Sequence, residues 1–128
     1  MSNLPRPSEF ELAILRVLWG RGSATVREVF VELQKERHLG YTTVLKTMLI
    51  LLEKKLVVRD ESERSHVYRA ARAEQETQAS LMKDLLDRAF GGSARKLVLA
   101  ALNEAPLSVE EEKEVRAILA ASRKKKER

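Results

Sequence analysis

Hydroxyl and cationic side chains gather in two short stretches of the chain. The first stretch carries Thr42, Thr43, Lys46 and Thr47. The second carries Arg59, Arg64, His66 and Arg69. Hydroxyl and ammonium groups reach base edges when a helix lies in the major groove of DNA, and cationic side chains bind the phosphates beside it. These residue types therefore predict contact with a polyanion.

The first stretch begins a segment, residues 42–55, with the periodicity of an amphipathic helix. At about 100° per residue, one broad face carries Val44, Leu45, Met48, Leu51 and Leu52. The opposite face carries Thr42, Thr43, Lys46, Thr47 and Ile50. The polar N-terminal half suits a major groove, because the helix dipole and free amides favour phosphate there. Taken alone, the pattern also fits an ordinary surface helix with threonines near its start.

Three sequences of the form S/T-x-x-E mark the starts of other helices. In such a capping box, each side chain satisfies the free amide of the other residue. The boxes are Ser8 with Glu11, Thr25 with Glu28 and Ser108 with Glu111. Gly20 is the predicted end of the first helix.

Two short strands are expected at residues 56–59 and 66–69, joined by the polar connector 60–65. The order of three helices and two strands predicts a winged helix-turn-helix, with the third helix in the groove and the hairpin over the adjacent backbone. We therefore assign further DNA contacts to Arg64, His66 and Arg69, while His66 also fits the role of an ordinary strand residue.

The composition becomes rich in alanine and glutamine near residue 70, and we place a domain boundary there. The prediction is a winged helix DNA-binding domain at 1–72 and a helical dimerisation domain with a basic tail at 73–128. The fold class is thus mainly α with a small β-hairpin. Apolar stripes in the second domain give the expected dimerisation residues Leu81, Leu85, Leu86, Phe90, Leu97, Val98 and Leu102.

Short helices of this kind are marginal alone, so their stripes need a partner surface. A second copy of the chain would bury them and would match the two-fold symmetry of a palindromic DNA site. The alternative is that these helices fold back onto residues 1–70. The basic end of the chain is a solvated terminus or a nonspecific phosphate contact.

Charge and composition narrow the class of protein. The net charge is +5, and residues 1–72 carry 13 basic against 9 acidic side chains, so the excess lies where DNA would bind. The absence of cysteine excludes disulfides, thiolate metal sites and a cysteine nucleophile. His38 and His66 have no companion ligand at helical spacing, and no catalytic motif is present, so we expect neither an enzyme nor a cofactor. Without a long apolar run or a signal peptide, a cytoplasmic protein with no membrane association is expected.

The chain resembles the BlaI/MecI penicillinase-repressor family, to which the copper-responsive CopY repressors also belong. The resemblance is carried by FELAILRVLWGRGSATVREVFVEL, YTTVLKTMLILLEKKLVVRD, RSHVYRA, FGGSARKLVLAAL and LSVEEEKEVRAIL. It spans roughly residues 8 to 120. It implies a homodimeric bacterial repressor of transcription on a palindromic operator, often with TACA and TGTA half-sites, with C-terminal helices forming the dimer.

The resemblance also implies an upstream sensor protease that cleaves an Asn-Phe bond in the C-terminal helices. The corresponding residues here are Ala100 and Ala101, so cleavage at this place is in question. Copper-responsive members carry a Cys-x-Cys pair, and its absence excludes soft-metal sensing through thiolates. The alternative to DNA binding is a winged helix used only for protein assembly, which the basic, threonine-bearing helix face disfavours.

Overall fold

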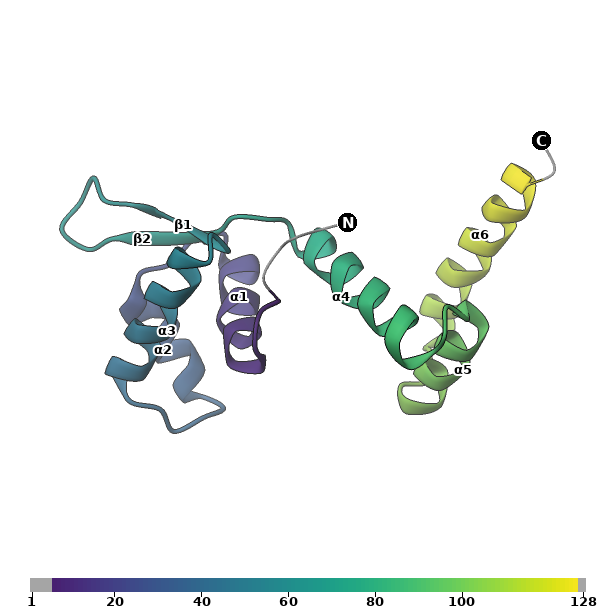
Figure 1. Cartoon of the computed structure of the whole chain (residues 1–128), viewed down its shortest axis with the longest axis horizontal. Coiled ribbons are helices and arrows are strands. Elements are labelled where there is room, and N and C mark those ends of the chain that lie inside the picture. Colours follow the sequence, from purple (N-terminus) through teal and green to yellow (C-terminus); the bar gives the residue numbers. More distant parts are fainter. Residues whose placement is uncertain (1–5, 127–128) are drawn as a thin grey trace. The chain divides into compact units, whose positions relative to one another are not determined.

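The structure is a computed structural model that describes residues 6–126 (Figure 1). The chain forms two compact units, one reaching to Met82 and the other starting at Lys83. The first unit contains α1 (Glu9–Arg21), α2 (Val26–Gln34), α3 (Tyr41–Glu53), β1 (Val57–Asp60), β2 (Val67–Ala70) and the start of α4 (Glu74–Ala89). The second contains the rest of α4, α5 (Ala94–Glu104) and α6 (Val109–Lys126). The expected mainly α fold with one hairpin is confirmed, whereas the boundary after residue 72 stays a prediction.

All three predicted capping boxes are present. At α1, the backbone amide of Ser8 donates to Glu11 Oε1 at 2.8 Å, and the amide of Glu11 donates to Ser8 Oγ at 3.2 Å. Equivalent reciprocal bonds start α2 at Thr25 and α6 at Ser108. Local sequence therefore determines where these helices begin.

The predicted end of α1 at Gly20 is wrong, because the helix continues to Arg21. The chain leaves the helix at Gly22, whose φ of 88° is a left-handed conformation that glycine adopts at little cost. Its backbone amide donates to the carbonyl oxygen of Leu18 at 2.7 Å. Spacing in the sequence does not show whether Gly20 or Gly22 ends the helix. The capping bond in the structure identifies Gly22.

The predicted hairpin is present, with each strand displaced by one residue from its expected position. Val57 pairs with Ala70 and Asp60 with Val67 in an antiparallel register. Ala24, which lies between α1 and α2, adds a third short segment through two hydrogen bonds with Tyr68, at 2.8 and 2.9 Å. The hairpin is thereby joined to the helices by backbone as well as by side chains.

The core of the first unit lies where the three helices meet the hairpin. Its fully buried side chains are Ile14, Leu15, Leu18, Val29, Val44, Met48, Leu51, Val57 and Tyr68. Trp19 lies at its edge, half-buried, and its indole nitrogen donates to the carbonyl oxygen of Arg72 at 2.9 Å. This bond fixes the chain just before α4 against the end of α1.

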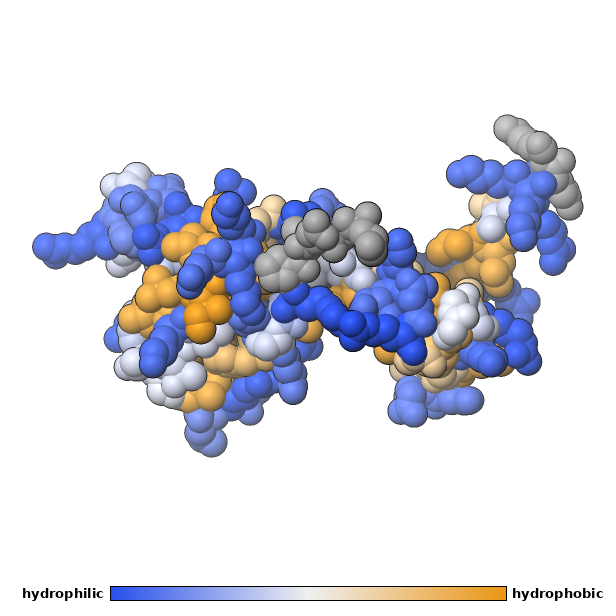
Figure 2. All heavy atoms as spheres, in the orientation of Figure 1, coloured by the Kyte–Doolittle hydropathy of each residue, from blue (hydrophilic) through white to orange (hydrophobic). Residues whose placement is uncertain are grey.

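The second unit has no such core among its described residues, since no side chain from Lys83 to Lys126 is buried. Gly91 and Gly92, with φ of 56° and 80°, separate α4 from α5, and Ser93 caps α5 by accepting from the Lys96 amide at 3.2 Å. Apolar surface is visible on α6 in Figure 2. Among residues 6–126, no helix is both long and apolar enough to cross a membrane.

Candidate nucleic-acid interface

Helix α3 is buried along one side and open along the other. Val44, Met48 and Leu51 are each 0% exposed, as the apolar face requires. Thr42, Thr43 and Lys46 are exposed. The helix is therefore fixed to the core by one face and presents two hydroxyls and an ammonium group at its N-terminal half.

Thr47 differs from the other polar residues of this helix. It is half-buried, and its hydroxyl donates to the backbone oxygen of Thr43 at 2.8 Å. Its hydrogen is thus used within the helix, and only its oxygen remains as an acceptor for another molecule.

The N-terminus of α3 carries no negative charge and no side-chain cap. Gly40 occupies the N-cap position, and no acidic residue lies in the first turn. Helices α1 and α2 instead carry glutamates there, Glu9 and Glu11 in α1 and Glu28 in α2. An uncapped first turn keeps the positive end of its dipole available to an anion.

An aromatic cluster that the sequence patterns did not reveal supports this end of α3. Tyr41, the first residue of the helix, meets Phe30 of α2 edge to face, with ring centroids 5.6 Å apart and an interplanar angle of 71°. The guanidinium of Arg27 lies 5.7 Å from the Tyr41 ring centre, within the range of a cation–π contact. Arg27 is exposed, so it adds a positioned cation beside the helix N-terminus.

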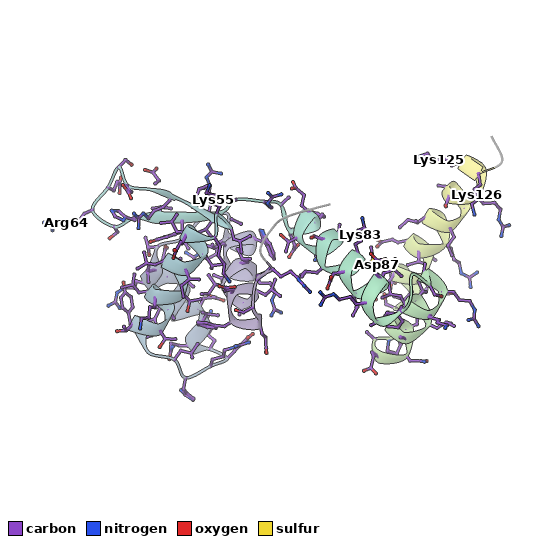
Figure 3. All side chains as sticks on the ribbon, viewed as in Figure 1. Lys55, Arg64, Lys83, Asp87, Lys125 and Lys126 are labelled. Atoms are coloured by element: carbon purple, nitrogen blue, oxygen red, sulfur yellow. The ribbon has the colours of Figure 1, made fainter. Side chains whose placement is uncertain are left out.

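The hairpin presents its other cations at and near its tip. Arg64 is exposed at the tip and points away from the strands, as Figure 3 shows. Arg69 is exposed on β2, whereas His66 is half-buried. The tip is ordered locally by Asp60, whose Oδ1 accepts from the Ser62 amide at 2.9 Å, and this bond lowers the pKa of the Asp60 carboxyl.

Arg59, the remaining hairpin cation, already has partners within the protein. Its guanidinium donates to the Tyr68 hydroxyl at 3.3 Å and forms an ion pair with Glu61. The hydrogen bonds with Tyr68 and Glu61 raise the pKa of Arg59 above its ordinary value. Arg59 therefore stabilises the hairpin near its tip and is a less available phosphate ligand than Arg64 or Arg69.

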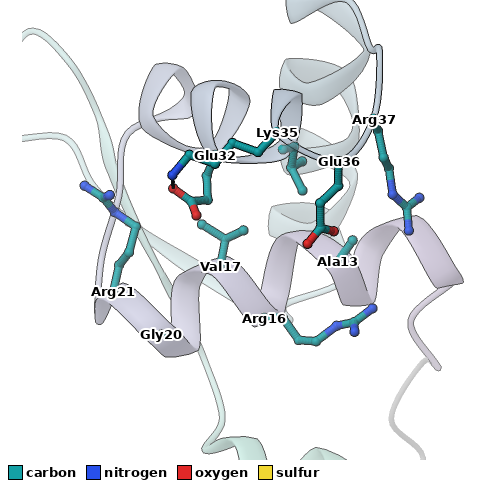
Figure 4. A pocket seen from close by; sticks show the side chains of 10 residues that line it. Ala13, Arg16, Val17, Gly20, Arg21, Glu32, Lys35, Glu36 and Arg37 are labelled. Atoms are coloured by element: carbon teal, nitrogen blue, oxygen red, sulfur yellow. Dashed lines mark hydrogen bonds and ion pairs between the residues drawn. The ribbon is translucent and has the colours of Figure 1, made fainter.

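A separate groove of about 420 Å³ lies between α1 and α2 (Figure 4). Its cations include Arg21 and Lys35, which pair with Glu28 at 2.7 Å and Glu32 at 3.2 Å. Because acids and bases alternate along it, this groove does not offer the uniform positive charge that a phosphate backbone requires. Within residues 6–126, no group of three His, Cys, Asp or Glu side chains could hold a metal ion.

The predicted dimerisation residues lie on α4 and α5, except Phe90, which directly follows α4. Leu85, Val98 and Leu102 are exposed, and the others are half-buried; these are Leu81, Leu86, Phe90 and Leu97. Ala100 and Ala101, which correspond to the expected cleavage pair, lie inside α5. A protease would need to unfold this helix locally to reach the bond between them.

The profile of the penicillinase repressor family matches residues 7–121. The penicillinase repressor of Staphylococcus aureus is 28% identical to this chain over 109 residues, which are 85% of this chain and 86% of that protein. The penicillinase repressor of Bacillus licheniformis is 28% identical over 126 residues, 98% of each chain.

One solved structure is also similar to part of the chain. It is the monomeric form of Bacillus licheniformis BlaI in complex with the blaP half-operator, and it is 28% identical to this chain with a TM-score of 0.52. The similarity covers 59% of this chain and 93% of the BlaI chain.

Proposed function

The chain belongs to the penicillinase repressor family, and on that premise we propose that it represses transcription as a homodimer bound to a palindromic DNA operator in the bacterial cytoplasm. The observation that carries the proposal is the state of α3. Val44, Met48 and Leu51 on its apolar face are fully buried, while Thr42, Thr43 and Lys46 are exposed beside an uncapped N-terminus. This combination suits a helix that enters the major groove end first.

The two sets of polar residues have different tasks in this proposal. Lys46 and Thr43 contact base edges and give sequence preference, and Thr42 and the oxygen of Thr47 assist them. Arg64, Arg69 and His66 on the hairpin contact phosphates and give affinity that varies little with sequence. The half-operator complex of the BlaI relative supports a DNA-facing role for the equivalent unit.

The second unit supplies the dimer. Its described side chains, and those of the whole of α4, are all at least partly exposed, leucines and valines included. An 11-residue and a 16-residue helix do not bury such surface on their own, and a second copy provides the missing partner. Two linked reading units then bind a palindrome together, with a gain from effective concentration of about 10²–10⁴.

Selection of bound sequences from a random duplex pool, using the intact chain, tests the proposal. We expect a palindrome whose half-sites are separated by about one helical turn or a multiple of it. Binding to random duplex should weaken steeply between low and moderate salt, because phosphate contacts release counterions. A protein-assembly module would enrich no sequence and would show no salt-dependent affinity, and that outcome would overturn the proposal.

A further inference from the structure

Helix α6 carries an apolar stripe that no part of the described structure covers. Val115, Ile118, Leu119 and Ser122 fall within an arc of about 100°. Ile118 is 67% exposed and Leu119 is 63% exposed. Neighbouring large apolar side chains this open to solvent indicate an interaction surface (Figure 2).

The charges of α6 are segregated by sign along the helix. Acidic residues occupy its first turn, and Arg123 to Lys126 occupy its last. On one flank of the stripe lie Glu112 and Arg123, and on the other lie Glu114 and Lys125, an acid and a base in each case. Figure 3 shows Lys125 at the C-terminal end of α6. The helix dipole favours this order of charges, but it does not account for the uncovered apolar stripe between the two flanks.

We propose that α6 pairs antiparallel with α6 of a second copy of this chain, with the two-fold axis passing between Ile118 and Leu119. The inference rests on the proposed homodimer and specifies one of its contacts. In this register Ile118 of each chain faces Leu119 of the other, and Val115 faces Ser122. Ile118 and Leu119, two of the most exposed apolar side chains of the helix, are then buried against each other.

Charge complementarity selects the antiparallel orientation. A two-fold axis perpendicular to the helices brings the same flank of both copies together. Glu112 then lies beside Arg123 of the second copy, and Glu114 lies beside Lys125 of the second copy. A parallel pair would instead place Glu112 beside Glu114, and Arg123 beside Lys125, so that both ends repel.

The same arrangement makes the chain selective for itself. Glu112 is already ion-paired with Arg116 of its own helix at 2.5 Å, which fixes its carboxylate on that flank. A related repressor whose last helix had another order of charges would lose the four pairs across the interface. The partner that this surface fits is therefore a second copy of the chain.

Disulfide trapping tests the orientation, because the chain contains no cysteine of its own. Under mild oxidation, a mixture of Val115→Cys and Ser122→Cys chains should form a covalent dimer in good yield. Ser122→Cys alone should not, since its two copies would be roughly 10 Å apart along the axis, beyond disulfide reach. Efficient trapping of Ser122→Cys alone, or no trapping in the mixture, would overturn the inference.

Charge reversal tests the complementarity on the intact chain. Arg123→Glu with Lys125→Glu should weaken dimerisation roughly tenfold to a hundredfold at low salt, and less at high salt. Adding Glu112→Lys and Glu114→Lys to that variant should restore most of the loss. The matched control is Lys113→Glu with Lys124→Glu, two reversals on the opposite face of α6, which should have little effect. Equal effects of the two reversals would refute the proposed pairing.

Sedimentation of the same samples separates this inference from the proposed function. A dimer with the wrong trapping pattern would reject the α6 pairing and leave the homodimeric repressor intact. A chain that is monomeric at all concentrations would reject both the pairing and the homodimer.

Discussion

The ion pair between Glu11 and Lys54 makes a sharp prediction, because its two members are buried to different extents. Lys54 Nζ lies 3.0 Å from both carboxylate oxygens of Glu11. The Glu11 side chain is 5% exposed, whereas that of Lys54 is 34% exposed. The pair joins the start of α1 to the end of α3, across 43 positions of sequence.

The loss in the free energy of unfolding should therefore depend on which partner is removed. In Lys54→Met the nearly buried Glu11 carboxylate keeps the hydrogen bond from the Ser8 amide but has no cation beside it. We expect the free energy of unfolding to fall by about 2–3 kcal/mol. Glu11→Gln leaves an ammonium group that can turn to water and an amide oxygen that can still accept from Ser8. We expect about 1 kcal/mol for that change.

Urea denaturation at neutral pH measures both values, with Lys55→Met as the matched control. Lys55 is the exposed neighbour of Lys54, so its substitution should cost little. A Lys54→Met variant as stable as Lys55→Met would refute the reasoning, since it would mean that the Glu11 carboxylate does not depend on its cation.

The same pair predicts a pH dependence with a definite sign. Burial raises the pKa of Glu11, but the hydrogen bond from the Ser8 amide and the pairing with Lys54 outweigh it, so the pKa lies below the ordinary 4.5. The resulting stabilisation is present above the unfolded-state pKa and is lost as the pH falls through the lower folded-state value. The stability difference between wild type and Glu11→Gln should therefore shrink in acid, and a constant difference would contradict this assignment.

The remaining predictions concern DNA binding and assembly. Lys46→Ala should weaken operator binding by roughly 1–3 kcal/mol, measured by fluorescence anisotropy, with no change in thermal midpoint, because Lys46 is exposed; unchanged affinity would remove it from the interface. Arg64→Ala should weaken binding about equally on all sequences and lower the salt slope by about one; a sequence-dependent loss would instead indicate minor-groove contact. Gly40→Asp should stabilise α3 by a few tenths of a kcal/mol, because aspartate is a better N-cap and the φ of −77° and open surroundings of position 40 admit a side chain. The same substitution should reduce DNA affinity, because it places a carboxylate where a phosphate is proposed to bind. Higher affinity in this variant would mean that the helix N-terminus does not face DNA. Leu85→Asp should dissociate the dimer in sedimentation and lower operator affinity together, because an unpaired carboxylate in an apolar interface is costly; a stable dimer would place Leu85 outside it.

Local rules of sequence were sufficient to predict most of the elements in the first unit. The boxes at Ser8 and Thr25 involve residues three positions apart, and the apolar face of α3 follows from a single helical period. The order of elements then restricted the fold to a winged helix. The start of α6 was predicted by an equally local signal, the box of Ser108 with Glu111.

Contacts between distant positions could not be predicted in this way. Tyr68 is 2% exposed and pairs with Ala24, but the sequence shows only an aromatic residue in a short strand. Arg59 had the same residue type as Arg64 and a similar position in the hairpin, and only the structure shows that Tyr68 and Glu61 bind it. The cluster of Arg27 with Tyr41 likewise depends on how α2 meets α3.

The two ends of α3 show how these local and distant contacts combine. Glu11 satisfies a local rule as part of a capping box, and the same carboxylate holds Lys54, the residue that ends α3. The C-terminal end of the helix is thus fixed to α1, while its N-terminal end is supported by Tyr41 against Phe30 and has no side-chain cap. A capping residue at position 40 would make the free protein more stable, but it would fill the positive helix end with the protein's own oxygen. The C-terminal end of α3 is therefore held in place by the protein, while the N-terminal end keeps backbone amides without a side-chain partner, where a phosphate is proposed to bind. A preorganised anion-binding helix requires both features.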